Sequence, residues 1–299
     1  MSSRSHLYVP GDQADKLGRA LDRGADALIV DLEDSVAPDA KPSARRLVAG
    51  WLARAGDHAE GRAPVEIWVR VNAVGSARPQ DIGDDVAAVV GPALAGICLA
   101  KTQSAEDVEL LGELLTGAEI GAGMEPGTLH VSALIESARG LLAAPAIATA
   151  ARLGRLQVGE ADLAAELRVA AGPDEGELAA LRLQVVVASA AAGIAAPIGP
   201  VSTNFEDLGA FRAGTERLKR LGFGGRAVIH PAQIPVVHEV FTPSPDEVRQ
   251  ARELVDRFDA AVASGSGVIV DEGGRMVDEA VVRVARNLLA RAGADPGER

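Results

Sequence analysis

Two stretches of the sequence decide the fold: LHVSALIESARG at residues 129–140 and RLQVGEADLAAEL at residues 155–167. In the first stretch an apolar run ends at Glu136, and in the second a shorter apolar run ends just before Asp162. Short apolar runs are typical of buried parallel strands, and a helical pattern lies between these two. Asp162 lies 26 residues after Glu136, close to the length of one strand–helix–strand unit. We therefore expect both carboxylates at the same end of one sheet.

Two carboxylates at a partly buried strand end repel each other, so they need a proton or a cation between them. Mg²⁺ prefers oxygen ligands and is commonly held by one or two carboxylates, waters and substrate oxygens. We therefore predict that Glu136 and Asp162 bind Mg²⁺, or Mn²⁺ in its place. The alternative is a local role, in which Glu136 caps the helix that begins at Ser137 and Asp162 begins another helix.

Composition narrows the class of protein. The chain has 299 residues, of which 47 % are apolar and 24 % charged, which suits one α/β barrel with an appended segment. The net charge of −12 argues against nucleic acid or an anionic membrane as a partner. The N-terminus lacks the apolar core of a signal peptide and no apolar run reaches membrane-spanning length, so we expect a cytoplasmic protein. The single cysteine, Cys98, lies in an apolar run, is expected to be buried and excludes a disulfide within the chain.

Strand and helix patterns alternate along most of the chain. Strands are expected at residues 6–10, 27–32, 65–71, 96–100, 131–135, 156–158, 196–201 and 226–230. Eight such units with polar residues at the strand ends predict a (β/α)₈ TIM barrel, whose active site lies at the carboxyl ends of the strands. A doubly wound open sheet is the competing fold, but no glycine-rich dinucleotide turn follows the first strand.

The pattern changes after residue 241. Residues 242–245 (TPSP) break the chain, and a helix (246–262), a hairpin (267–277) and a last helix (278–292) are expected to follow. We therefore divide the chain into a barrel, residues 1–241, and a C-terminal helix–hairpin–helix lid and oligomerisation segment, residues 242–299. This segment is too small to hold a core alone, so we expect it to pack on the barrel or on a neighbouring subunit.

Charged residues also follow the second and third expected strands. Glu33 and Asp34, together with Asp31, form an acidic cluster, which is either catalytic or a solvated loop. Arg70 lies between two valines, where a guanidinium is expected to bind a carboxylate or phosphate. An internal ion pair is the alternative for Arg70.

Lys101 ends the fourth strand, and contact with the substrate or pairing with a neighbouring acid would explain it equally. His230, before Pro231, could be a base, but we favour a structural histidine at a strand end. No Ser–His–Asp or Cys–His set lies at suitable positions. A metal held by two carboxylates, with one inward arginine, indicates metal-assisted enolate or aldol-type chemistry at a carboxylate- or carbonyl-bearing substrate.

Motifs along nearly the whole chain share the order and spacing of one family: RS (4–5), PG (10–11), DLEDSVAP (31–38), VRVN (69–72), ALIESARG (133–140), GEADLAAEL (159–167), IHPAQ (229–233), EVFTPS (239–244) and GRMVD (274–278). They resemble the citrate lyase β-subunit-like acyl-CoA lyases of the HpcH/HpaI aldolase superfamily, which include malyl-CoA and citramalyl-CoA lyases. DLEDSVAP and the pair VFTPS and GRMVD are the most specific of these motifs.

The resemblance implies a (β/α)₈ barrel with a C-terminal lid, assembled as a homotrimer or a dimer of trimers in which the lid crosses to a neighbour. In such enzymes the residues matching Glu136 and Asp162 bind Mg²⁺, and the arginine matching Arg70 steadies an enolate or thioester oxygen. The aspartate matching Asp278 comes from a neighbouring subunit's lid and acts as acid or base at the acetyl carbon. The alternative for Asp278 is that it only caps the last helix.

The implied reaction is the reversible cleavage of a short 3-hydroxy-3-carboxyl acyl-CoA to acetyl-CoA and a 2-oxo acid. Candidates are citramalyl-CoA, malyl-CoA and citryl-CoA, so acyl-CoA and 2-oxo acids are the expected partners. One alternative is hydrolysis of the thioester at the same site, in a thioesterase or malate-synthase-like activity. The other is a non-catalytic subunit of a lyase complex.

The candidate catalytic residues are Arg70, Asp278, Glu33 and Asp34. The candidates for binding substrate or CoA are Arg4, Tyr8, Arg19, Lys101, Pro200 and Val201.

Three departures from the family pattern concern the identity of the substrate more than the chemistry. Gln13 stands where many relatives carry Arg or Lys, with Arg19 as a nearby basic residue, and Ala100 replaces the usual proline before Lys101. Residues 198–201 (IGPV) replace an Asp-Gly-Pro-aromatic pattern.

Overall fold

A computed structural model describes residues 3–55, 65–172, 174–271 and 273–293 of the chain. The chain divides into two compact units, residues 3–238 and the residues from 239 onward, and each is described by itself. The predicted domain ranges, 1–241 and 242–299, stay a prediction, and residues 294–299 lie outside the described residues.

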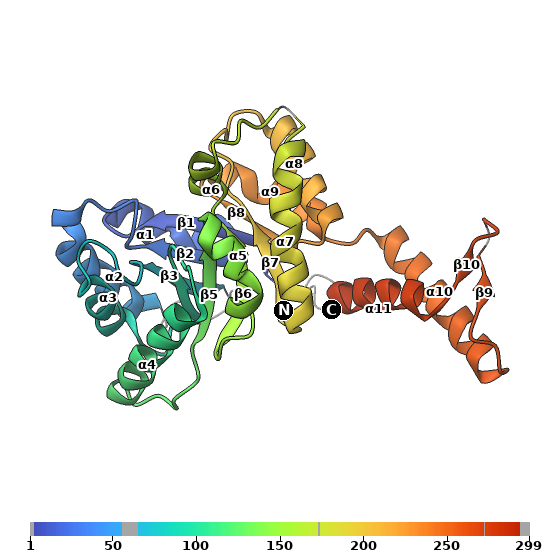
Figure 1. Cartoon of the computed structure of the whole chain (residues 1–299), viewed down its shortest axis with the longest axis horizontal. Coiled ribbons are helices and arrows are strands. Elements are labelled where there is room, and N and C mark those ends of the chain that lie inside the picture. Colours follow the sequence, from blue (N-terminus) through green and yellow to red (C-terminus); the bar gives the residue numbers. More distant parts are fainter. Residues whose placement is uncertain (1–2, 56–64, 173, 272, 294–299) are drawn as a thin grey trace. The chain divides into compact units, whose positions relative to one another are not determined.

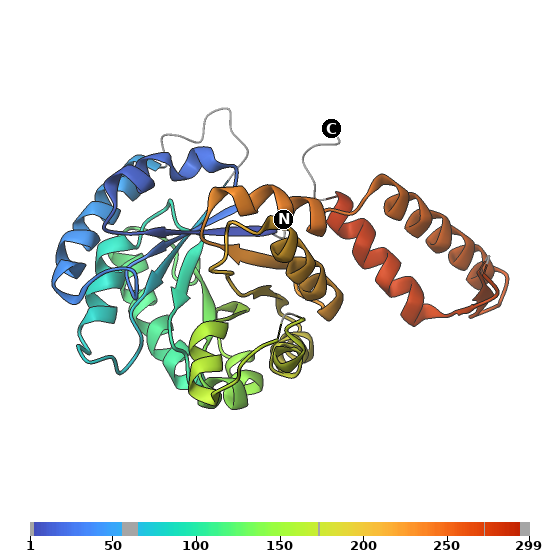
Figure 2. The same cartoon turned by 90° about the horizontal axis from the view of Figure 1, so that it is seen from above.

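The first unit is a closed barrel of eight parallel strands in chain order, so the predicted (β/α)₈ fold is confirmed. Helices surround the strands on the outside, as Figures 1 and 2 show. The strands are β1 (Ser5–Pro10), β2 (Ala27–Asp31), β3 (Glu66–Val71), β4 (Gly96–Leu99), β5 (His130–Ile135), β6 (Leu153–Val158), β7 (Ala195–Gly199) and β8 (Gly225–Val228). Each lies within a few residues of its predicted range.

The helices of the barrel follow the strands. They are α1 (Ala14–Ala20), α2 (Lys41–Ala55), α3 (Asp81–Val89), α4 (Ala105–Gly121), α5 (Ala138–Ile147), α6 (Glu160–Leu167), α7 (Gly176–Ala192) and α8 (Leu208–Leu221). A further helix, α9 (Ile234–Phe241), runs across the division between the two units. Local signals explain several starts: Ser104 and Asp107 form a capping box at the start of α4, and the Ser137 hydroxyl caps α5.

The two-residue period of a strand determines which side chains fill the barrel. Every second side chain points inward and the others pack beneath the helices. The inward positions lower in the barrel form an apolar cluster with Tyr8 packed against it: Ala27, Ile29, Trp68, Cys98 and Leu134. Continuing the same alternation toward the carboxyl ends places Asp31, Arg70 and Glu136 on the inner side of the barrel mouth. The burial of Cys98 is as expected.

The second unit contains α10 (Pro245–Ala263), the strands β9 (Ile269–Val270) and β10 (Met276–Val277), and α11 (Glu279–Gly293). The two strands pair antiparallel, which confirms the predicted hairpin, although Glu272 at its turn lies outside the described residues. Phe258, Val277 and Val282 form a small core of their own. This core is far smaller than that of the barrel.

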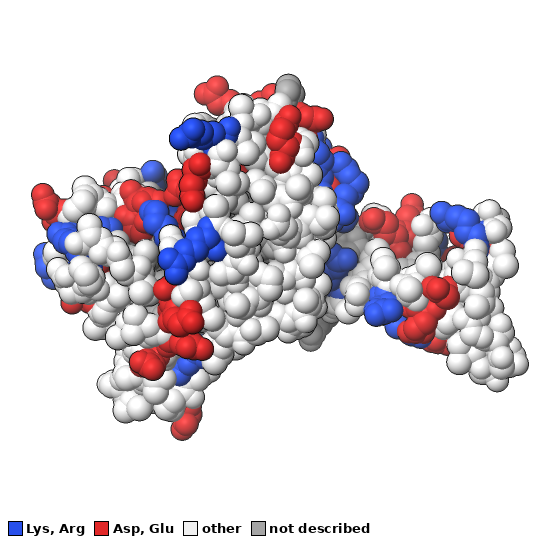
Figure 3. All heavy atoms as spheres, in the orientation of Figure 1, with Lys and Arg blue, Asp and Glu red and all other residues white. Residues whose placement is uncertain are grey.

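The surface of the barrel unit carries both signs of charge. In Figure 3 most of the visible face of the barrel unit, including the area over α7, is uncharged, and lysines, arginines and acidic residues lie in groups around it. The exposed apolar side chains of α7 include Leu183 and Val187. Among the described residues, no helix has both the length and the apolar character needed to cross a bilayer.

We predict that Gly96→Ala destabilises the barrel, because a Cβ there would overlap the His130 carbonyl oxygen and the Trp68 ring. The free energy of unfolding should fall by about 1–3 kcal/mol or more, as for overpacked cores. The control is Gly83→Ala, since Gly83 lies within α3 with open space around its Cβ position. That change should raise the free energy of unfolding by about 0.5–1 kcal/mol. Urea unfolding of both variants measures the difference, and equal midpoints would contradict the packing described for Gly96.

Candidate active site

A cavity of about 550 Å³ opens among the carboxyl ends of the strands. Six of the residues predicted from sequence line it: Tyr8, Asp34, Arg70, Glu136, Asp162 and Val201. They come from strands or loops far apart in the chain, and the closed barrel brings them together. A position at the strand carboxyl ends is where barrel enzymes build their active sites.

Arg70 is held in a fixed orientation by Asp31. The register of β2 and β3 places the two residues opposite each other, and the Arg70 Nε and Nη2 donate to the two Asp31 carboxylate oxygens, each at 2.7 Å. The internal ion pair considered for Arg70 is therefore present, although the same side chain also lines the cavity. Burial alone raises the pKa of Asp31, but the hydrogen bonds and charge of Arg70 outweigh it and hold that pKa below its usual range.

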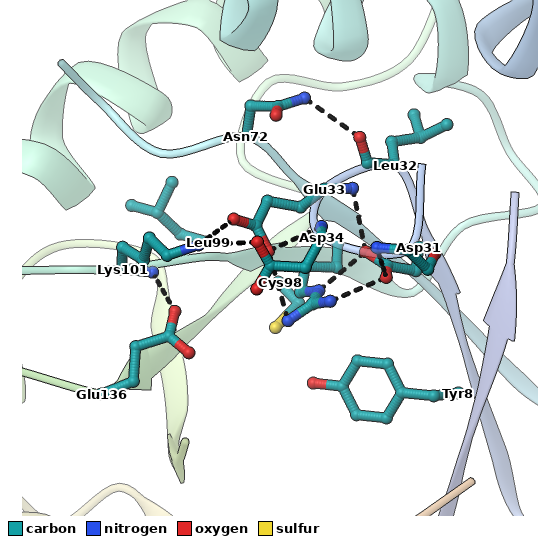
Figure 4. A network of polar contacts seen from close by, with 12 residues as sticks. Tyr8, Asp31, Leu32, Glu33, Asp34, Asn72, Cys98, Leu99, Lys101 and Glu136 are labelled. Atoms are coloured by element: carbon teal, nitrogen blue, oxygen red, sulfur yellow. Dashed lines mark hydrogen bonds and ion pairs between the residues drawn. The ribbon is translucent and has the colours of Figure 1, made fainter. Parts of the chain in front are cut away.

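The acidic cluster forms ion pairs with Arg70 and Lys101, and Asp31 and Glu33 are buried whereas Asp34 is exposed. Asp31 accepts the backbone N–H groups of Glu33 (2.9 Å) and Ser35 (3.1 Å). The Lys101 amino group contacts the carboxylates of Glu33 and Asp34, the latter at 2.8 Å, as Figure 4 shows. Of the two explanations for Lys101, pairing with neighbouring acids is observed. Burial raises the pKa of Glu33.

Glu33 and Lys101 also line a second cavity of about 440 Å³, beside the loop of residues 73–77 and the start of α4. The acid–lysine cluster therefore lies between the two cavities. Because Glu33 and Lys101 are absent from the lining of the first cavity, Asp34 is the member of this cluster that faces it.

Glu136 is a buried carboxylate at the end of β5, with 6 % of the residue exposed. Its Oε1 accepts the backbone N–H of Lys101 at 2.6 Å, and its other side lies against Gly159, where any Cβ would overlap Glu136. Burial raises the pKa of Glu136 to about 7. The capping alternative for Glu136 is wrong, since Ser137 caps α5 with its own hydroxyl.

Asp162 lies in the first turn of α6, exposed toward the cavity. The adjacent Glu160 is anchored by Arg182 of α7, whose Nε and Nη2 donate to the two Glu160 oxygens at 2.6 Å each. Arg182 is almost fully buried, at 2 % exposure, and it also pairs with Glu175. This anchor fixes the start of the helix that carries Asp162.

Several cavity residues escaped the sequence analysis. Gln157 lines the cavity, accepts from the Tyr8 hydroxyl at 3.4 Å and donates to Ser132. The sequence signal that could have identified it is its inward-facing position on β6, one residue before the last residue of the strand. Lys16 lines the cavity on the side of α1. It lies three residues after Gln13, and so supplies a basic group one helical turn beyond the position where relatives are basic.

Other predicted residues are placed elsewhere. Arg4 precedes β1 at the amino end of the barrel, where its Nε pairs with Asp26 at 2.9 Å, so the structure does not bring it to the cavity. Arg19 is exposed on α1 and does not line the cavity. The Pro200 carbonyl accepts from Arg226, while Val201 reaches the cavity wall. His230 is structural, as favoured: its Nδ1 accepts the Ala232 N–H and its ring stacks on Phe205.

Asp278 belongs to the second unit. Its carboxylate accepts the backbone N–H groups of Ala280 (3.0 Å) and Val281 (3.2 Å), so it caps α11. The capping interaction considered from the sequence is therefore present. A capping carboxylate keeps other lone pairs, so this contact and a catalytic role are compatible.

The residues present suit a hard divalent cation. Glu136 and Asp162 offer carboxylate oxygens to the same cavity. No group of three or more His, Cys, Asp or Glu side chains with metal-binding geometry occurs among the described residues. Two carboxylates are a common donor set for Mg²⁺, with waters and substrate oxygens completing the shell.

Fold and site together define a (β/α)₈ barrel with an acidic, arginine-containing pocket at its carboxyl end. The family model of the HpcH/HpaI aldolase/citrate lyase family matches residues 4–231. The chain belongs to this family, as the sequence motifs indicated.

Its relatives carry more than one activity. The chain is 37 % identical to the citrate lyase subunit beta of Escherichia coli over 97 % of this chain and 93 % of that protein. It is 35 % identical to a (3S)-malyl-CoA thioesterase of Cereibacter sphaeroides over 97 % of this chain and 95 % of the relative. Among solved structures, protein CitE from Mycobacterium tuberculosis, in complex with magnesium, acetoacetate and coenzyme A, superposes with a TM-score of 0.76 at 29 % identity, covering 98 % of each chain.

We predict that Glu136→Gln stabilises the metal-free protein at pH 8. The pKa of Glu136 rises from its usual 4.5 to about 7 on folding, so its contribution to stability is fully present below pH 4.5 and is lost as pH rises through 7. Glutamine keeps an acceptor for the Lys101 N–H and never ionises. With EDTA present, the variant should gain about 2–3 kcal/mol at pH 8 and little at pH 4.5.

Urea unfolding of both proteins at several pH values measures this difference, and the other titrating groups are common to both. The same variant should lose Mn²⁺ binding. A stability difference that is independent of pH would contradict the raised pKa.

Proposed function

We propose that the protein is a Mg²⁺-dependent carbon–carbon lyase, which reversibly cleaves a short 3-hydroxy-3-carboxyl acyl-CoA to acetyl-CoA and a 2-oxo acid. The observation that carries this proposal is the shared cavity: two carboxylates suited to a cation, Glu136 and Asp162, and the guanidinium of Arg70 all line it. The kinship with citrate lyase subunit beta supports the reaction class, and the magnesium, acetoacetate and coenzyme A of the CitE complex support the ligands.

In this proposal Glu136 and Asp162 hold Mg²⁺, which as a Lewis acid would polarise the oxygens of the 2-oxo acid. Arg70 faces the thioester oxygen and stabilises the charge that develops there. Asp31 contributes by fixing the Arg70 fork, so that no reorganisation is needed when that charge appears.

Proton transfer is assigned to Asp278 of a neighbouring subunit's C-terminal segment, in a homotrimer or a dimer of trimers. In the condensation direction Asp278 takes a proton from the acetyl methyl group, and the electron pair moves toward the thioester oxygen beside Arg70. The resulting carbon nucleophile adds to the keto carbon of the 2-oxo acid, and the former keto oxygen takes up a proton to become the hydroxyl. Cleavage is the reverse of these steps.

Thioester hydrolysis is the second candidate, and the malyl-CoA thioesterase relative favours it. Incubation with malyl-CoA, citramalyl-CoA and citryl-CoA in the presence of Mg²⁺, followed by mass spectrometry, separates the two. A lyase forms acetyl-CoA and a 2-oxo acid, whereas a thioesterase forms free CoA and the intact hydroxy acid. Failure to convert any of the three esters would favour a non-catalytic subunit of a lyase complex.

We predict that Arg70→Lys is nearly as inactive as Arg70→Ala. A lysine offers a point charge on a flexible stem, so it cannot bond both Asp31 oxygens and also face the thioester. The rate should fall by about 10²–10³, as on removal of one oxyanion donor. Arg23→Lys, at an exposed position of the same unit, is the control for the chemical change itself. Near-normal turnover in Arg70→Lys would mean that Arg70 serves only as the ion-pair partner of Asp31 and does not act on the thioester.

Asp278→Asn separates the two roles of Asp278. Asparagine caps a helix as well as aspartate does, so α11 should keep its stability, whereas Asp278→Ala loses the cap as well. If Asp278 moves the proton, both variants should lose turnover to the same extent, although only the alanine variant melts earlier. Full activity in Asp278→Asn would leave Asp278 as a cap alone.

The origin of Asp278 is tested by mixing Asp278→Ala with Glu136→Ala under conditions of subunit exchange. A site shared between subunits should recover a fraction of the activity, because some interfaces would pair an intact Asp278 with an intact Glu136. Exchange without recovery would place Asp278 in its own subunit's site or outside the reaction.

A further inference from the structure

Lys101 adopts a backbone conformation that its side chain disfavours. Its φ is 48°, in the left-handed region, where a residue with a Cβ is strained. The residue lies two positions after the end of β4, and the next residue, Thr102, donates its N–H to the Leu134 carbonyl and its hydroxyl to the Leu99 carbonyl. Such strain persists where the surroundings over-determine the conformation, and it is concentrated at functional sites.

The strained turn directs the backbone N–H of Lys101 toward Glu136, the proposed metal ligand. The Lys101 N–H donates to Glu136 Oε1 at 2.6 Å, and within the described part of the chain it is the sole hydrogen-bond donor to Glu136. A short hydrogen bond to an ionised carboxylate is among the stronger kinds. It occupies Oε1, while Oε2 packs against Gly159, where a Cβ would overlap that oxygen.

The other end of Lys101 is also held by its neighbours. Its amino group contacts Glu33 and lies 2.8 Å from Asp34 Oδ1, and the Glu33 side chain is only 8 % exposed. Glu33 in turn lies 3.4 Å from Arg70 Nη1. The amino group is thus bound to the acidic loop after β2, while the backbone of the same residue is bound to the end of β5, as Figure 4 shows.

We propose that Lys101 is a positioning residue: the grip of Glu33 and Asp34 on its amino group holds its backbone in the left-handed turn that orients Glu136 for a divalent cation. This inference rests on the metal pair of the proposed function and refines it. Lys101 then acts through Glu136 and makes no direct contact with the CoA ester or the 2-oxo acid.

The structure allows a test that separates this role from substrate binding. Lys101→Ala removes the amino group, but alanine has a Cβ and is still strained in the left-handed turn. Without the ion pairs that hold it, the turn should relax, and the backbone N–H should move away from Glu136. Lys101→Gly removes the same amino group, but glycine adopts the left-handed turn without strain. If Lys101 positions Glu136, the alanine variant should bind metal more weakly than the glycine variant, although both lack the ammonium.

The measurement is Mn²⁺ binding to the full chain without substrate, followed by electron paramagnetic resonance. The Kd of Lys101→Ala should rise about 10–100-fold, as on loss of an outer-shell partner of a metal ligand, while that of Lys101→Gly stays near wild type. The urea midpoint of Lys101→Gly should also exceed that of Lys101→Ala, the reverse of the order at ordinary positions.

Arg152 provides the matched control, since its φ is 65° and it lies before β6 at the amino end of the barrel. Arg152→Ala and Arg152→Gly should differ in urea midpoint in the same sense, with equal Mn²⁺ affinity.

Equal Mn²⁺ affinity of the two Lys101 variants would overturn the proposal, and a raised KM for the ester in both would assign Lys101 to the substrate. A wild-type protein that binds no Mn²⁺ would overturn the proposal together with the metal pair. Normal Mn²⁺ results without turnover of any ester would count only against the proposed reaction.

Discussion

The site depends on the buried ion pair between Arg70 and Asp31. Both groups lie inside the barrel mouth, and removal of either would leave an uncompensated buried charge. The pair does more than neutralise charge, because the same Asp31 carboxylate also accepts two backbone N–H groups of the loop that follows β2. The position of Glu33 and Asp34, and through them of Lys101, therefore depends on Arg70. Loss of this ion pair would therefore displace several of the residues that line the cavity.

The charge balance around the cavity explains why a cation fits there. The residues that line the cavity include acids and bases: Asp31, Asp34, Glu136, Glu160, Asp162, Lys16 and Arg70. Arg70 pairs with Asp31, Lys101 with Asp34 and Arg182 with Glu160, and burial raises the pKa of Glu136 to about 7, so in the metal-free protein Glu136 takes up a proton readily. A divalent cation would replace that proton. Metal affinity and pH are thus linked through one residue.

Much of the architecture could be predicted because strand alternation and caps are local properties. The apolar runs ending in Glu136 and before Asp162 correctly indicated neighbouring strands of a barrel, and both residues line one cavity. The Ser104 capping box at the start of α4 is likewise a short-range signal in the sequence. The assignment of Arg4 and Arg19 to the cavity rested on the family resemblance alone, and the structure places neither of them there.

The barrel, the strand ends that carry its chemistry and the family could be predicted from the sequence, because two-residue and 3.6-residue periods are patterns of consecutive residues. Which side chains pair with one another depends on the folded structure. The Arg70–Asp31 bond depends on the register of β2 and β3, and Glu160 and Arg182, 22 residues apart, meet only in the folded barrel. Nothing in the neighbouring sequence indicates the left-handed turn at Lys101. In the proposed role the turn is held by contacts with distant residues, because acids 67 and 68 residues away bind the Lys101 amino group and Glu136 accepts its N–H. Contacts of this kind join residues that are distant in the chain, and their partners are fixed only when the barrel closes.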